Sequence, residues 1–121
     1  YIKPQENGNK TEVRWAAITN RCGAGLLACG MPLMETSAHE FSAEEMARTR
    51  HHYQLQPSAG IFFHIDHRQA GLGSNSCGPE PLPHYLVPPK QTTFTVRLKA
   101  FSRKREDPMD IYSQLFSPHR V

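Results

Sequence analysis

A stretch dense in proline and glycine, residues 70–89, constrains the fold of this 121-residue chain more than any other feature. Five of the ten prolines lie there, at positions 79, 81, 83, 88 and 89. Proline has no backbone N–H to donate to a sheet and breaks the interior of a helix, so neither element can continue through the stretch. We therefore predict a long ordered loop, and loops of this length in compact domains are often functional.

The segments on either side of this loop have the patterns of β-strands. Residues 91–101 alternate between polar and apolar side chains, and the apolar face is formed by positions 94, 96, 98 and 100. Residues 61–68 (IFFHIDHR) begin with apolar side chains on both faces. Such a run is typical of a central strand that is covered on both sides, and we predict one here.

The first third of the chain predicts a hairpin. Residues 12–19 place Trp15 on one face together with other apolar side chains, as expected of a strand whose tryptophan lies in the core. Residues 20–25 have the composition of a turn, and residues 26–29 form the returning strand. A further strand at 33–41 is weakly patterned.

One short helix interrupts the strands. Ser42 and Glu45 have the spacing of a capping box, in which the serine hydroxyl and the glutamate carboxylate each accept from a free amide at the helix start. The residues that follow, to about Arg50, are good helix formers. With some six strands, one helix and no alternating βα units, the predicted class is an all-β, antiparallel β-sandwich.

Composition argues against several kinds of partner. The formal charge is only +3, and no run of like charge could follow a phosphate backbone, so we expect no nucleic-acid partner. No apolar stretch approaches the length of a membrane span, so we expect no membrane partner. Three cysteines without C-x-x-C spacing favour neither a disulfide framework nor a zinc site, and they indicate a reducing, cytoplasmic setting.

The richest polar cluster is the His64-Ile65-Asp66-His67 run, with His51 and His52 upstream. In a strand, His64 and Asp66 share one face and His67 lies on the other, which leaves two ligands on one surface and too few for a metal. We interpret the run as a strand end whose polar groups hydrogen-bond the neighbouring loop, and we predict no metal site.

No catalytic residues are predicted in this chain. Hydrolysis of a glycoside needs two carboxyl groups that face one sugar bond, about 5 Å apart in a retaining enzyme. Glu44 and Glu45 belong to the helix start, and no second acid is evident beside Asp66 in its apolar strand. Cys77 lacks the surroundings of a nucleophile motif, and we interpret it as a loop thiol.

The last domain of glycoside hydrolase family 2 β-galactosidases is similar to this chain in three stretches, YIKPQENGN, HIDHRQAGLGSNSCGPE and PHYLVPPKQTTFTVRLKAF. They occur in the family's order, with FSAEEMARTRHHYQL between them. The resemblance covers residues 1–101 and implies the later portion of a large antiparallel sandwich of the galactose-mutarotase-like type. Residues 102–121 lie outside it and form a charged tail that is either a docking helix or disordered.

The resemblance also implies where the chemistry lies. In the family, the catalytic glutamates and the Mg and Na ligands belong to other domains, and the last domain contributes a glycine-rich loop that rims the galactose pocket. Some members place a tryptophan there, and Cys77 occupies the matching position, beside Asn75 and Ser76. A thiol offers much less surface than an indole for stacking on a sugar ring.

These observations predict a non-catalytic C-terminal portion of a retaining β-galactosidase that hydrolyses terminal β-D-galactosides such as lactose. The expected partners are the remainder of that enzyme, on the same chain or a large subunit, and the galactoside substrate, in an intact enzyme that is a homo-oligomer. Two alternatives stay open. A free-standing carbohydrate-binding module would need an exposed aromatic platform, for which Trp15 is the only tryptophan. A purely structural piece would serve subunit contacts.

Overall fold

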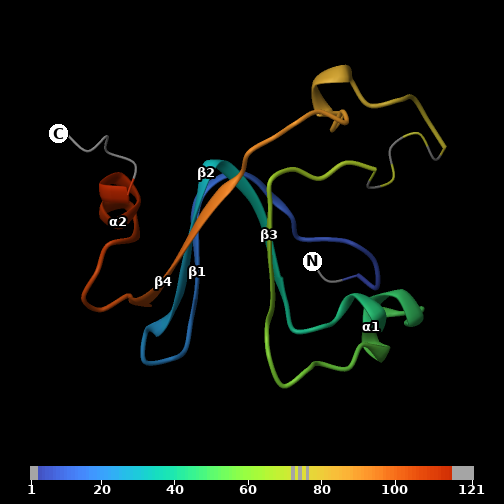
Figure 1. Cartoon of the computed structure of the whole chain (residues 1–121). Coiled ribbons are helices and arrows are strands. Elements are labelled where there is room, and N and C mark those ends of the chain that lie inside the picture. Colours follow the sequence, from blue (N-terminus) through green and yellow to red (C-terminus); the bar gives the residue numbers. More distant parts are fainter. Residues whose placement is uncertain (1–2, 72, 74, 76, 116–121) are drawn as a thin grey trace. The chain divides into compact units, whose positions relative to one another are not determined.

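The fold was analysed in a computed structural model, which describes residues 3–71, 73, 75 and 77–115. The described strands form one four-stranded sheet of order β1-β2-β3, in which β4 also pairs with β2 (Figure 1). The elements are β1 (Lys10–Thr19), β2 (Ala24–His39), α1 (Ala43–Arg48), β3 (Phe62–Asp66), β4 (Thr95–Ser102) and α2 (Pro108–Leu115), with short 3-10 helices at His52–Gln54 and Pro83–Tyr85. The predicted antiparallel all-β class is confirmed, with four described strands in place of some six.

The strand β2 joins two segments that the sequence predicts as separate strands. Residues 24–31 pair with β4, and residues 35–39 pair with β3, both antiparallel. The change of partner coincides with Pro32, which has no N–H to donate to either ladder. A Cβ at Gly30 would lie 2.7 Å from the Cβ of Met34, so this bend in β2 requires glycine.

The chain divides into two compact units: the first holds residues 1–11 and 35–92, and the second holds residues 12–34 and 93–121. In the second unit, β1 and β2 form a hairpin around the turn that begins at Asn20. The Asn20 side-chain oxygen accepts from the amides of Cys22 (2.9 Å) and Ala24 (3.1 Å). A Cβ at Gly25 would collide with the carbonyl oxygen of Ile18, so only glycine allows the two strands to approach this closely.

The core of the second unit lies between the sheet and α2. Its buried members are Leu27, Cys29, Phe101 and Ile111, and Trp15 packs against them together with Ala17 and Tyr112. Trp15, predicted to lie in the core, is partly buried and packs against it. Burial raises the pKa of the Cys29 thiol, an effect that the charge of Arg97 opposes.

The opposite face of the same strands is apolar and partly exposed, although Ala28 at its centre is buried. The register pairs Leu26 with Ala100 and Gly30 with Val96. Leu98 lies on this face and is 56% exposed, and Leu26 is 40% exposed. We call the side chains of Leu26, Val96, Leu98 and Ala100 the outer apolar face. The alternation in residues 91–101 correctly predicts this face, but the core of the unit uses the other one.

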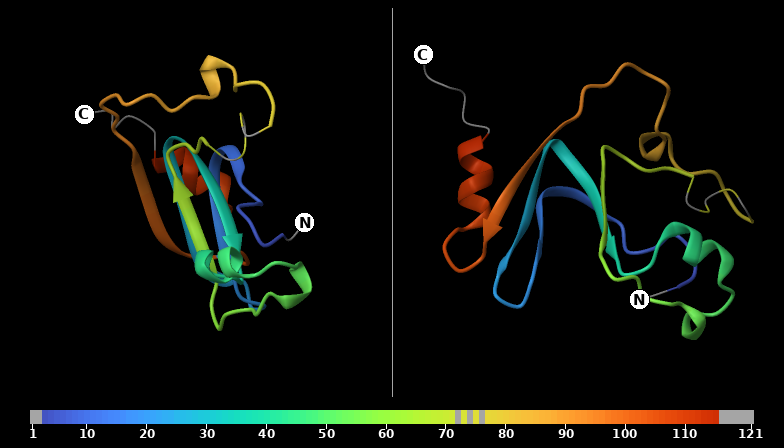
Figure 2. Two further views of the ribbon diagram at one scale, coloured as in Figure 1. Left: turned by 90° about the vertical axis from the view of Figure 1, so that its right-hand side faces the viewer. Right: turned by 60° about the horizontal axis from the view of Figure 1, so that its bottom comes forward.

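In the first unit, β3 lies beside the C-terminal part of β2 (Figure 2). Among the described residues, β2 is the strand that pairs with β3, so β3 ends the sheet path, and Phe62 is 37% exposed. The prediction of a central, well-covered strand is therefore wrong for the described part of the chain. The side chains of β3 therefore present more apolar surface, on both faces, than the described neighbouring residues bury.

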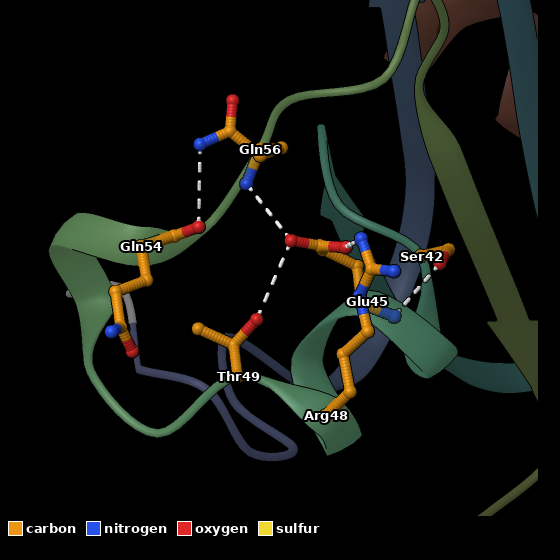
Figure 3. A network of polar contacts seen from close by, with 6 residues as sticks. All are labelled: Ser42, Glu45, Arg48, Thr49, Gln54 and Gln56. Atoms are coloured by element: carbon orange, nitrogen blue, oxygen red, sulfur yellow. Dashed lines mark hydrogen bonds and ion pairs between the residues drawn. The ribbon is translucent and has the colours of Figure 1, made fainter.

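The helix α1 shows half of the predicted capping box. The Ser42 hydroxyl accepts from the Glu45 amide at 3.0 Å, as expected. The Glu45 carboxylate instead accepts from the Gln56 amide (3.1 Å), pairs with Arg48 and lies 3.4 Å from the Thr49 hydroxyl (Figure 3). The Gln56 N–H, and after it Arg48, hold the pKa of Glu45 below its ordinary value against the effect of burial. Glu45 therefore ties α1 to the segment that follows it.

Candidate functional site: the glycine- and proline-rich loop and its polar base

The long loop predicted from the prolines follows β3. Between β3 and β4, the described residues contain neither strand nor α-helix, and one short 3-10 helix lies at Pro83–Tyr85. Asn75 and Cys77 are both exposed. Asn75 has a φ of 67°, in the left-handed region that asparagine tolerates better than most residues. Ser76, the third predicted rim residue, lies outside the described residues.

The start of the loop is held by a set of polar side chains. The amide nitrogen of Gln69 donates to Glu35 Oε2 at 3.1 Å, and its side-chain nitrogen donates to Asp66 Oδ2 at 2.9 Å. Asn9 Nδ2 donates to the same Glu35 oxygen at 2.7 Å. We call Asn9, Glu35, Asp66 and Gln69 the polar base of the loop. It brings together an N-terminal residue, two neighbouring strands and the residue that precedes the loop.

Glu35 and Asp66 are direct partners in the register of β2 and β3. Side chains of directly paired residues project from the same face, with Cβ atoms about 4.5–5.5 Å apart. The prediction that no second acid lies beside Asp66 is wrong, because Glu35 is its direct partner. Glu35 was missed because the register of two separated strands was unknown. Both carboxylates are half-buried and accept from amide donors of the polar base, which assigns them a structural role.

A further hydrogen bond joins the residue before Gln69 to the 3-10 helix inside the loop. Arg68 Nη2 donates to the carbonyl oxygen of His84 at 2.9 Å. A Cβ at Gly71, Gly73 or Gly78 would meet nothing within 4 Å, so the described glycines of the loop are open to solvent. The described hydrogen bonds therefore hold the start of the loop and its 3-10 helix.

The histidine run follows its structural interpretation in part, because Asp66 contacts the start of the loop whereas His64 contacts strand β2. His64 Nδ1 lies 3.2 Å from the Ser37 hydroxyl, and Asp66 accepts from Gln69 beside the loop. His51 and His52 are exposed. Over the described ranges, no group of three or more His, Cys, Asp or Glu side chains could hold a metal ion.

A hollow of about 470 Å³ lies in the second unit. It is lined by Trp15, Ala17, Thr19, Phe101, Arg103, Glu106, Asp107 and Pro108. Its two carboxylates are already engaged: Asp107 accepts from the amide of Met109 at the start of α2 at 2.7 Å, and Glu106 accepts from the amide of Ser102 at the end of β4 at 3.1 Å. Glu106 also pairs with Lys99, which together with the Ser102 amide lowers the pKa of its carboxyl.

Sequence comparison assigns the family. The profile described as beta galactosidase small chain matches residues 1–98, which include both the polar base and the loop. The chain belongs to the β-galactosidase small-chain family. Helix α2 lies beyond the matched residues.

Three relatives of this small-chain family member are called β-galactosidases. The one from Priestia megaterium is 37% identical over 101 residues, which cover 80% of this chain and 10% of the relative. Those from Staphylococcus xylosus and Arthrobacter sp. are each 30% identical and cover 82% and 83% of this chain. The chain spans about 10% of the length of these relatives. Among its described helices, none is long and apolar enough to cross a membrane.

Proposed function

We propose that this chain is the non-catalytic C-terminal portion of a β-galactosidase, where it completes a β-sandwich and rims the substrate pocket. The observation that carries the proposal is the family match over residues 1–98, combined with relatives named β-galactosidases of which the matched part is about 10%. In this proposal the rest of the enzyme is the main partner of the chain, on the same polypeptide or on a large subunit.

The uncovered surfaces support this role. The outer apolar face is formed by side chains of β2 and β4, and β3 carries more apolar surface than its described neighbours bury. Contiguous exposed apolar surface on a sheet marks a protein contact, because water contact with that surface is unfavourable. The upstream remainder of the sandwich is the occupant that the family match suggests.

We assign the pocket rim to Asn75, Ser76 and Cys77. Asn75 and Cys77 are exposed on a loop whose start and 3-10 helix are held by hydrogen bonds, so the surface they present is free to contact a ligand. Asparagine and serine can hydrogen-bond sugar hydroxyls, and a thiol shapes a pocket while adding little stacking surface. Retaining hydrolysis would be carried out by two glutamates in other domains, where we also place the Mg and Na sites.

The test is hydrolysis of a chromogenic β-galactoside by the chain alone, by the separately produced remainder alone, and by the two mixed. We expect no hydrolysis by either part alone and hydrolysis after the two are mixed. Turnover by the 121 residues alone would contradict the proposal and direct attention to Glu35 and Asp66 as a carboxylate pair. Lack of turnover on mixing, with both parts folded and the whole enzyme active, would also count against an accessory role.

A free-standing carbohydrate-binding module is the second candidate, and the hollow beside Trp15 is the observation in its favour. An indole wall with nearby hydroxyl and charged groups is a common arrangement for sugar binding. Addition of galactose or lactose to the chain would then shift Trp15 fluorescence. An insensitive, blue-shifted emission is the result expected if Trp15 only packs against the core.

The setting of the whole enzyme is part of the same proposal. Cys22, Cys29 and Cys77 are free thiols, which fits a reducing compartment, and we propose a cytoplasmic homo-oligomer.

A further inference from the structure

We infer that Glu35 is a positioning residue that holds the pocket-rim loop in place and thereby sets the affinity of the enzyme for galactosides. The inference rests on the proposed function of the loop, and it assigns a role to a residue that lies on β2, outside the loop. Glu35 would act through Gln69, the last residue before the loop, and would not touch the substrate.

The pairing of Glu35 with Asp66 carries an energetic cost. Like charges on directly opposed residues of two strands repel each other, and both residues are half-buried, where charge is less well solvated. Such a pair persists only when donors compensate for it. Here the compensating donors come from Gln69 and Asn9, so the pair binds the segments that carry those two residues.

The orientation of the two amides shows how strongly the carboxylates direct them. Asn9 and Gln69 both turn their side-chain nitrogens to a carboxylate oxygen. Their side-chain oxygens, Asn9 Oδ1 and Gln69 Oε1, are buried without a hydrogen-bond partner in the part of the chain described. An unsatisfied buried acceptor is unfavourable, so the bonds to the carboxylates outweigh that loss.

Glu35 controls the near end of the loop more directly than Asp66 does. Its Oε2 atom accepts from the backbone of Gln69, so it fixes the path of the main chain, whereas Asp66 holds only the side chain. The 3-10 helix within the loop is tied by the hydrogen bond from Arg68 to His84, and a Cβ at Gly71, Gly73 or Gly78 would meet nothing within 4 Å. Loss of the Glu35 carboxylate would therefore displace the loop from its start.

The experiment uses the complete β-galactosidase that contains this chain and compares KM and kcat for a chromogenic galactoside. For Glu35→Ala we expect KM to rise about tenfold while kcat stays within about twofold, because the loop contributes binding and the catalytic groups lie elsewhere. Glu35→Gln keeps an oxygen that can accept both amides, so it should restore KM to within about threefold. Glu40→Ala, which removes an exposed carboxylate from the same strand region, is the matched control and should change nothing.

A second readout follows the loop independently of activity. In the same proteins, the rate at which iodoacetamide alkylates Cys77 is measured by peptide mass spectrometry, and we expect it to rise in Glu35→Ala and to return toward the starting rate in Glu35→Gln. If Glu35→Ala does not fold, Glu35→Asp replaces it, because the shorter carboxylate keeps the charge and stretches the bonds to Gln69 and Asn9. An unchanged KM and an unchanged alkylation rate in a folded variant would overturn the inference.

Cys77→Trp in the same enzyme separates this inference from the function on which it rests. If Cys77→Trp alters KM and Glu35→Ala does not, the loop rims the pocket and the role of Glu35 is refuted. If Glu35→Ala accelerates alkylation of Cys77 while neither variant alters KM, Glu35 positions the loop and the pocket-rim assignment is refuted.

Discussion

Gly25 shows how a single residue can set the approach of two strands. It lies on β2 just after the turn, where a side chain would meet the carbonyl oxygen of Ile18 on β1. Its partner on the other side, Phe101, is buried in the core of the second unit. The glycine therefore lets β1 and β2 close together while β4 brings Phe101 into the core.

We predict that Gly25→Ala destabilises the second unit by about 3 kcal/mol, because the added methyl group must push the backbone of β1 away. Gly60→Ala is the control, since a Cβ there meets nothing within 4 Å, and it should change stability by no more than about 0.5 kcal/mol. Urea unfolding followed by Trp15 fluorescence would measure both changes. Equal stability of the two variants would show that the hairpin can relax around a side chain.

For single residues, the sequence correctly predicts contacts that are made with nearby positions in the chain. The Ser42 cap depends on a residue three positions further on, and the contact of Trp15 with the core follows from strand alternation, and both are found. Glu35 could not be predicted, because its role depends on pairing with Asp66 far along the chain. The second hydrogen bond of the capping box, between the Glu45 carboxylate and the helix start, is predicted wrongly for a similar reason. The carboxylate accepts from the amide of Gln56, which lies outside the helix.

At the scale of elements, α2 supplies part of the core of the second unit. Ile111 is 7% exposed and lies among Leu27, Cys29 and Phe101. The start of the helix is fixed by Asp107, which accepts from the amides of Met109 and Asp110. A helix of eight residues is marginal by itself, so its packing against the sheet provides most of its stability.

We predict that Ile111→Ala lowers the free energy of unfolding by about 3 kcal/mol, through lost apolar contact and a cavity between helix and sheet. Met109 lies on the same helix and is 45% exposed, so Met109→Ala should cost about 0.5 kcal/mol or less. Thermal denaturation monitored by circular dichroism would compare them. Similar losses for both would mean that α2 does not depend on its contact with the sheet.

The strand β2 shows where prediction of elements fails. Gly30 and Pro32 have the composition of a break, and the sequence therefore gives a short strand and a weak one. The chain remains extended through both because β4 pairs with residues 24–31 and β3 pairs with residues 35–39. Which partner lies beside each part is tertiary information that the local pattern does not contain.

At the scale of the whole molecule, the outer apolar face governs how the chain behaves in isolation. The chain alone should dimerise or aggregate, because Leu26 and Leu98 on this face and Phe62 on β3 remain exposed. The all-β class was predictable from strand alternation and proline placement. Which face would be covered was not, because the cover on one side comes from α2, beyond the family match.

We predict that Leu98→Lys reduces self-association of the isolated chain and weakens its assembly with the remainder of the enzyme, because a charge replaces apolar contact on the outer apolar face. Leu82→Lys is the control, since Leu82 is about as exposed (59% against 56%) but lies in the loop. Sedimentation velocity would measure the association state, and mixing assays would measure assembly. A sharp monomeric boundary for the unsubstituted chain would contradict the prediction, because it would show that the chain does not self-associate.

The long strand β2 also has a consequence for the order of folding. Its partner over residues 24–31 is β4, which follows these residues by more than sixty positions in the sequence. One edge of β2 in the hairpin with β1 therefore stays unpaired until β4 has been synthesised. Pairings between distant segments form slowly because a long loop has to close first. During that interval the open edge of β2 can accept β4 from a neighbouring nascent chain. Exchange of β4 between two copies is therefore the misassembly that this topology favours during expression at high concentration.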